Sequence, residues 1–270
     1  MGGRCMRPLI MVTNDDGVFS PGIRNAAEAA MRFGEVLIVA PIQQQSGMGR
    51  AFPRIPDQGI IERCYLNING QQMIAYGVHG SPANAAAEGV AEIAVRKPDL
   101  LISGINYGCN MGLSLTSSGT MGACFEVYSL GIPVLAVSLE TNMKDAMDRK
   151  GYANIDFSSA KETAEYWIDD MLVSRSGYDF LNVNVPYGQI NPEQYTWTFQ
   201  EMQNYYALLE EQKRTEGNDK PYILKYDIRV DPLKLHKGSD MFTVCEDRQI
   251  SVTPITMDMT YREGCRRFGE

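Results

Sequence analysis

Short apolar runs alternate with alanine-rich segments over the first half of the chain. The run Leu9–Thr13 is followed by a polar turn and an alanine-rich segment that ends near Arg32, and a second apolar run lies at Val36–Ala40. Ser20-Pro21 places a capping hydroxyl before a proline at the first helical position. Strand, helix and strand in this order pair as a parallel sheet that is covered by helices. The sequence therefore predicts an α/β fold.

The alternation continues beyond residue 80. Ser81-Pro82 predicts a helix over Ala83–Val95, and the apolar run Leu100–Ser103 predicts a strand. A glycine-rich loop is expected over residues 104–119. The later predicted elements are a helix at Thr120–Leu130, a strand at Pro133–Ser138, a helix at Ser158–Val173 and a strand at Phe180–Val185.

Two segments depart from this pattern. The strand-like runs Ile60–Leu66 and Gln72–Val78 flank Asn69-Gly70, a strong hairpin signal, and predict a hairpin at the rim of the sheet. From about residue 191 the periodicity weakens, with candidate strands only at Tyr222–Val230 and Ile250–Pro254. We expect this last part to be an appendage to the sheet that pairs subunits.

Composition limits the partners. Thirty-three acidic and twenty-five basic residues give the 270-residue chain a net charge of −8, which argues against binding to nucleic acid or to anionic membranes. The apolar runs are shorter than the roughly 18 residues of a membrane span. The first residues lack the apolar stretch of a secretory signal, so a cytoplasmic location is expected.

Cysteine and histidine usage limits the metal chemistry. The six cysteines form no Cys-x-x-Cys pair, and we expect reduced thiols that pack in the core. The chain contains only two histidines, His79 and His236. A His-rich zinc or copper site is thereby excluded, and a metal site would consist of oxygen ligands for magnesium, manganese or calcium.

Parallel sheets bind ligands beyond the carboxyl ends of their strands, so the loops after Leu9–Thr13, Val36–Ala40 and Leu100–Ser103 are the candidate site. In the first loop, Asp15 and Asp16 are adjacent carboxylates that could share one divalent cation. The same spacing also fits a turn that caps the following helix.

The other two loops offer neutral polar groups. The second contains Ser46 and Gly47, and could equally be a flexible surface loop. The third contains Asn106 and Asn110 between glycines, which allow the backbone to approach a ligand. Residues 117–120 (Ser-Ser-Gly-Thr) directly precede a predicted helix, where free N–H groups could bind a phosphate or simply be capped.

Common catalytic motifs are missing from the sequence. It has no Walker P-loop and no Gly-x-Ser-x-Gly elbow, and His79 is expected to be a loop histidine rather than a base. A haloacid-dehalogenase-like phosphatase would have aspartates at positions i and i+2 after the first strand, whereas Asp15 and Asp16 are adjacent.

Taken together, these motifs resemble the SurE family of metal-dependent 5'/3'-nucleotidases. The resemblance rests on five segments: 12–23 (VTNDDGVFSPGI), 39–47 (VAPIQQQSG), 80–83 (GSPA), 98–108 (PDLLISGINYG) and 118–120 (SGT). Residues 181–186 (LNVNVP) and 250–254 (ISVTP) are similar to later segments of the family.

The resemblance implies a Rossmann-like, three-layer α/β fold with a parallel sheet. It implies a catalytic domain over residues 1–190 and a C-terminal extension over 191–270, built of strands or a hairpin and a tail, that is exchanged between subunits of a homodimer or homotetramer. The implied reaction is hydrolysis of nucleoside 5'- and 3'-monophosphates by water activated by one Mg²⁺ or Mn²⁺ per subunit.

The resemblance also implies roles for individual residues. The metal ligands would be Asp15, Asp16, Ser46 and Asn106, with both aspartates catalytic and Asp15 accepting a proton from the attacking water. The phosphate would be bound by Asn14, Gly47, Asn110, Ser118, Gly119 and Thr120.

Two of the segments that carry the resemblance depart from the family pattern or run into a departure from it. Asn84 replaces an expected aspartate, and Ile42-Gln43 replaces an expected Asp-Arg pair. We expect these changes to alter substrate choice or rate more than metal binding. They also leave open an alternative function, a nucleotide-binding or regulatory module whose activity has decayed.

Overall fold

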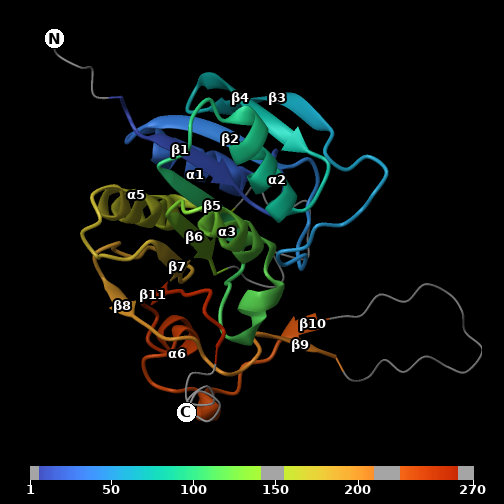
Figure 1. Ribbon diagram of the computed structural model, residues 1–270. Coiled ribbons are helices and arrows are strands. Elements are labelled where there is room, and N and C mark those ends of the chain that lie inside the picture. Colours follow the sequence, from blue (N-terminus) through green and yellow to red (C-terminus); the bar gives the residue numbers. More distant parts are fainter. Residues whose placement is uncertain (1–5, 141–154, 210–225, 261–270) are drawn as a thin grey trace, which may run out of the picture.

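Figure 1 shows the computed structural model, which describes residues 6–140, 155–209 and 226–260. Within these residues the central sheet has the strand order β3-β4-β2-β1-β5-β6-β7-β11-β8. Its strands are β1 (Leu9–Thr13), β2 (Glu35–Pro41), β3 (Ile61–Ile68), β4 (Gln71–Val78), β5 (Leu100–Tyr107), β6 (Val134–Leu139), β7 (Phe180–Val185), β8 (Tyr195–Trp197) and β11 (Ile250–Pro254). A separate antiparallel pair consists of β9 (Tyr206–Leu208) and β10 (Tyr226–Ile228).

The middle of the sheet is parallel, from β4 through β2, β1, β5 and β6 to β7. β3 is antiparallel to β4 and forms one edge, so the predicted hairpin at the rim is confirmed. At the other side β11 is antiparallel to β7. The mixed α/β fold with a large, mostly parallel sheet is therefore confirmed.

Helices cover both faces of this sheet. They are α1 (Pro21–Met31), α2 (Pro82–Glu88), α3 (Gly119–Ser129), α5 (Ser158–Leu172) and α6 (Asp240–Cys245). Alternate residues of β1 point to opposite faces: Ile10 belongs to the core beneath α1 and α5, whereas Met11 belongs to the core beneath α3. The result is three layers, as the sequence predicts. None of the described helices has both the length and the apolar character needed to cross a membrane.

Serine caps set the start of three helices. The side chains of Ser20, Ser81 and Ser118 accept hydrogen bonds from the N–H groups three residues later. At α2, Asn84 completes a reciprocal capping box with Ser81. Asn84 has a local structural role, because its amide oxygen accepts the Ser81 N–H at 3.4 Å.

Several predicted boundaries were wrong. β5 extends to Tyr107 instead of ending at Ser103, and its pairing with β6 shifts register between Ser103 and Asn106. Asn106 thus lies in an irregular strand rather than in a loop. The predicted helix over Ala83–Val95 ends as α at Glu88 and continues as a π-helical turn over Gly89–Ile93. A 3₁₀ turn, Leu113–Ser117, interrupts the predicted loop.

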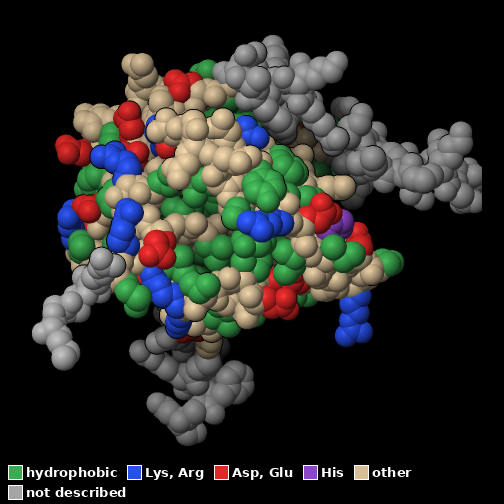
Figure 2. Space-filling model, turned by 90° about the horizontal axis from the view of Figure 1, so that it is seen from above, with side chains coloured by type: hydrophobic (Ala, Val, Ile, Leu, Met, Phe, Trp, Pro, Cys, Tyr) green, Lys and Arg blue, Asp and Glu red, His purple; other side chains and the backbone are tan. Residues whose placement is uncertain are grey.

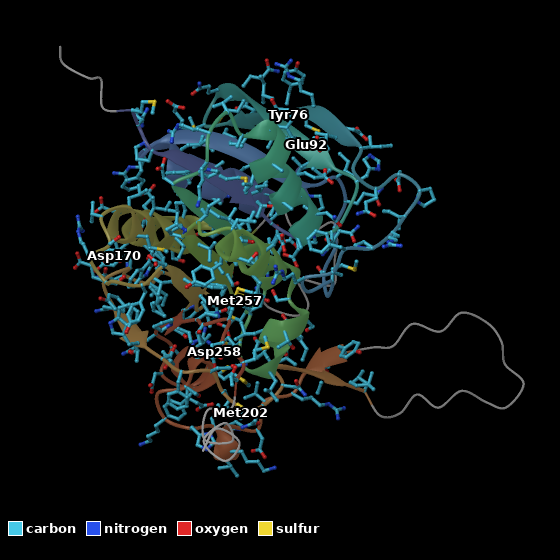
Figure 3. All side chains as sticks on the ribbon, in the orientation of Figure 1. Tyr76, Glu92, Asp170, Met202, Met257 and Asp258 are labelled. Carbon is cyan, nitrogen blue, oxygen red and sulfur yellow. The ribbon has the colours of Figure 1, made fainter. Side chains whose placement is uncertain are left out.

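The C-terminal part contains elements that the sequence did not predict. β8, β9 and α6 are short, and only β10 and β11 fall within predicted strands. The predicted strand Tyr222–Val230 begins outside the described residues, and its described part forms β10. Figure 3 places Met202 of this part at the end of the molecule opposite to Tyr76 of the hairpin. Pairing of subunits by residues 191–270 stays a prediction.

Close packing of α1 on β5 fixes the strand that carries Asn106. A Cβ atom added at Gly22 would lie 2.0 Å from the carbonyl oxygen of Ile105. Neither backbone can move without disturbing the sheet or the helix. The start of α1, and with it the loop of Asp15 and Asp16, is therefore held against β5.

We predict that Gly22→Ala lowers the free energy of unfolding by about 1–3 kcal/mol, because overpacking forces backbone shifts. Urea unfolding followed by circular dichroism would measure this. Arg24→Ala, at an exposed position of the same helix, is the control and should be nearly neutral. Equal stability of the two variants would contradict the packing argument.

Candidate active site

Three loops meet at the carboxyl edge of β1, β2 and β5. The N–H of Gln45 donates to the carbonyl oxygen of Asp15 at 2.7 Å, which joins the first loop to the second. The N–H of Gly49 donates to the carbonyl oxygen of Ser117 at 2.9 Å, which joins the second to the third. The sequence prediction that these loops converge agrees with this arrangement.

Asp15 joins the first loop to the start of α3. The hydroxyl of Thr120, in the first turn of α3, donates to the Asp15 carboxylate at 2.7 Å. This approach requires a glycine at position 119, because a Cβ there would lie 2.7 Å from the Cβ of Asp15. The start of α3 is thus directed at Asp15, and Gly119 and Thr120 support this carboxylate.

The alternative role for Asp15 and Asp16 is to form the turn that caps the following helix. In the structure, Asn14 forms that turn. Its side-chain oxygen accepts the N–H of Gly17 at 3.2 Å, and its amide donates to the Ser20 hydroxyl at 2.7 Å. Asn14 is fully buried. Asp15 and Asp16 are therefore not needed to shape the turn or to cap α1.

The surroundings of Asp15 and Asp16 disfavour the charged form of both carboxyl groups. Burial raises the pKa of Asp15, although hydrogen bonds from Thr120 and Gly119 oppose that rise. Burial, and then repulsion from Asp15, raises the pKa of Asp16 well above its usual value. Among the described residues neither carboxylate has an ion-pair partner. A bound cation would remove this cost.

Asn106 presents an oxygen to the same region. Its side-chain nitrogen donates to the carbonyl oxygen of Gly108 at 2.8 Å and to that of Tyr107 at 3.3 Å. The amide nitrogen is thereby used by the backbone, whereas Oδ1 accepts no hydrogen bond from the described residues and could bind a cation. The N–H of Tyr107 donates to Asp16 at 3.3 Å, which holds the second aspartate beside this strand.

A cavity of about 740 Å³ opens beside these groups. The predicted site residues that line it are Asp15, Ser46, Gly47, Asn106, Asn110 and Ser118. Asp16 lines a smaller neighbouring cavity of about 250 Å³ together with Ile42, and Tyr107 lines both. Asn14, Gly119 and Thr120 are buried and are not part of either lining.

Asn110 is held by side chains of β6 and β7. Asn184 of β7 accepts its backbone N–H at 2.8 Å and donates to its carbonyl oxygen at 3.1 Å, and Asn182 donates to the same oxygen at 2.9 Å. The Asn110 side chain donates to the hydroxyl of Ser138 at 2.9 Å. Four buried polar contacts thus fix the position at which Asn110 faces the cavity.

The lining also includes residues that the sequence did not single out. They are Tyr107, Leu113, Ser114, Thr116, Asn204, Tyr206, Leu208 and Tyr226, whereas Ser117 of the predicted segment 117–120 also lines the cavity. Tyr107 adjoins Asn106 and could have been found by extending the strand. The four residues from Asn204 to Tyr226 belong to the C-terminal part, and no local pattern connects them with the first loops.

The histidines lie elsewhere. His79 contacts Asp57 at 2.8 Å and Glu62 at 2.5 Å, and it lines neither of these two cavities. These two carboxylates, Glu62 first, raise the pKa of His79. Among the described residues no group of three or more His, Cys, Asp or Glu side chains could hold a metal ion. A metal at this site would need hydroxyl and amide oxygens besides the two carboxylates.

Comparisons with known proteins identify the family of this chain. The family model described as "Survival protein SurE" matches residues 10–207. The chain belongs to the SurE family. The 5'-nucleotidase SurE of Methanobrevibacter smithii is 36% identical over 254 residues, which cover 93% of this chain and 95% of that one. The 5'-nucleotidase SurE of Methanosphaera stadtmanae is 34% identical over 253 residues, with the same coverage.

A solved structure of the SurE family has the same fold. The crystal structure of the SurE protein from Aquifex aeolicus superposes with a TM-score of 0.73 at 28% identity, and the match covers 96% of this chain and 98% of that one. The resemblance given by the sequence motifs is thereby confirmed, and it extends through the C-terminal part.

We predict that Asp16→Asn stabilises the metal-free protein at neutral pH. A carboxyl group whose pKa is higher in the folded than in the unfolded protein loses stability as pH rises from about 4 through the folded pKa. In EDTA, the variant should gain about 1 kcal/mol in the free energy of unfolding at pH 8, and less at pH 5. Urea unfolding at both pH values would measure it.

Asp179→Asn, at an exposed aspartate that lines neither cavity, is the matched control and should change little at either pH. A loss of stability in Asp16→Asn at pH 8 would show that the Asp16 carboxylate is satisfied by the protein itself.

Proposed function

We propose that this protein is a metal-dependent phosphomonoesterase that hydrolyses nucleoside 5'-monophosphates and also 3'-monophosphates. The observation that carries the proposal is the pair of adjacent carboxylates beyond β1, the buried Asp15 and the half-buried Asp16, which have no cationic partner among the described residues. The relatives named 5'-nucleotidase SurE support the substrate class.

The residues present fit a divalent cation held by oxygen atoms. Its ligands would be Asp15 and Asp16 of the first loop, Ser46 of the second loop and Asn106 near the end of β5. When bound, Mg²⁺ or Mn²⁺ would polarise a phosphoryl oxygen and lower the pKa of water. No described residue that lines the larger cavity is Lys, Arg or His, so the charge of a phosphate would have to be balanced without a basic side chain.

The surrounding polar groups would orient the ester. Gly47, Asn110 and Ser118 line the cavity and are proposed to hold the phosphate, with the second N–H of the Asn110 amide free to donate. Asn14, Gly119 and Thr120 are proposed to act on the phosphate indirectly, because their contacts shape the loop and support Asp15. Asp15 would accept a proton from the attacking water.

We propose further that the protein is located in the cytoplasm and forms a homodimer or homotetramer through residues 191–270. Three apolar side chains of this part, Trp197, Phe199 and Met202, are 42%, 51% and 69% exposed. No nucleic acid partner is proposed. On the face seen in Figure 2, Lys and Arg side chains alternate with Asp and Glu instead of forming a basic patch.

Multi-angle light scattering tests the assembly. We predict a mass of two or four chains for the native protein, and a shift to smaller species for the double variant Trp197→Ser, Phe199→Ser. A monomeric native protein at micromolar concentration would refute the proposed homo-oligomer.

We predict that Asp15→Asn lowers metal-dependent release of phosphate from AMP at least about 100-fold, because the site loses a charged ligand and the proton acceptor. Phosphate release from 5'-AMP and 3'-AMP would be assayed with Mg²⁺, Mn²⁺ and EDTA. EDTA should abolish the native activity, and added metal should restore it.

Asp179→Asn is again the control and should keep native activity. Unimpaired hydrolysis by Asp15→Asn would refute the assignment of the site. Binding of AMP without turnover by the native protein, with each metal, would favour a nucleotide-binding module over an enzyme.

A further inference from the structure

The larger cavity has an end that the phosphate chemistry does not use. Its wall there is one face of the antiparallel pair β9 and β10, which lie side by side in Figure 1. Leu208 pairs directly with Tyr226, so their side chains project from the same face. Tyr206 precedes Leu208 by two residues and shares that face. All three line the cavity.

This face is apolar and open. Leu208 is 45% exposed and Tyr226 52% exposed, although both are large and border a cavity. Within the described lining no basic side chain accompanies them, so this end is not built for a second phosphate. Asn204 adds an amide that can donate and accept hydrogen bonds. A flat group with a polar edge would fit such a wall.

Tyr206 connects this end with the carboxylates. Its backbone N–H donates to the hydroxyl of Ser114 at 3.3 Å, which holds β9 against the 3₁₀ turn Leu113–Ser117. Tyr206 lines the same cavity as Asp15. This one cavity therefore includes the Asp15 carboxylate as well as Tyr206, Leu208 and Tyr226.

We propose that Leu208 and Tyr226 form a nucleobase subsite, in which the base of the substrate stacks on the ring of Tyr226 while its phosphate lies near Asp15. The proposal rests on the proposed nucleotidase function and adds the residues that select nucleotides over other phosphate esters. Stacking on an aromatic ring is available to every base, so the subsite accepts several bases and favours the larger purines.

The subsite acts on binding and not on the reacting atoms. Tyr226 therefore contributes to KM for a nucleotide and leaves kcat nearly unchanged. An ester without a base cannot use it. Ribose 5-phosphate is the matched substrate, because it keeps the sugar and the phosphoester of AMP and lacks only the base.

The test is steady-state hydrolysis of AMP and ribose 5-phosphate by Tyr226→Ala. We expect KM for AMP to rise about tenfold, from the loss of one stacking contact, with kcat within about twofold and kcat/KM for ribose 5-phosphate unchanged. Tyr226→Phe should restore the native KM, since the ring remains. Tyr65→Ala, at an exposed tyrosine of β3 that does not line the cavity, is the control and should change neither substrate.

Two results would overturn the subsite: an unchanged KM for AMP, or an equal loss of activity on both substrates, which would indicate a structural role. If the native protein hydrolyses neither ester, the proposed function fails but the subsite stays testable, because calorimetry measures binding of adenosine alone. Weaker binding of adenosine by Tyr226→Ala than by Tyr226→Phe supports the subsite, and equal binding refutes it.

Discussion

The hydrogen bond from the Thr120 hydroxyl to the Asp15 carboxylate holds this site together. It is a buried contact between residues 105 positions apart, and it directs the first turn of α3 at the loop that follows β1. Gly119 permits the approach because no Cβ lies between the helix and the aspartate. The bond holds the Asp15 carboxylate in place and offsets part of the free-energy cost of burying its charge. A bound cation would offset the remainder.

The parallel sheet explains why three separate loops can share one ligand. β2, β1 and β5 are neighbours with the same direction, so the chain leaves each of them at one edge. Backbone hydrogen bonds between the loops, from Gln45 to Asp15 and from Gly49 to Ser117, then fix their spacing. Neither of these two bonds involves the side chain of Ile42 or Asn84. The expected effect of these departures on rate or substrate choice stays a prediction.

Much of the sheet and part of the cavity lining could be predicted from the sequence. The apolar runs, the Ser-Pro helix starts and the Asn69-Gly70 turn are local signals, and the structure has an element at each of them. Asn106 was placed in a loop because Gly104 and Gly108 flank it, whereas pairing with β6 carries the strand past the glycine to Tyr107. β8, β9 and α6 are three to six residues long, too short for a periodic pattern to show.

The sequence does not reveal Tyr206, Leu208 and Tyr226 as cavity residues, and the reason is a different one. Their place in the cavity depends on contacts between β9 and the segment 112–114, including the bond from Tyr206 to Ser114. Such long-range contacts leave no trace in local composition. The C-terminal part was therefore expected to pair subunits, while the structure also makes it a wall of the cavity.

The proposed site requires Asp15, Asp16, Ser46 and Asn106 to bind one divalent cation together. Anomalous diffraction from crystals soaked in Mn²⁺ would locate that cation. We expect a single strong peak about 2.0–2.6 Å from oxygens of these four side chains. A peak elsewhere, or none at saturating Mn²⁺ with the carboxylates unchanged, would contradict it.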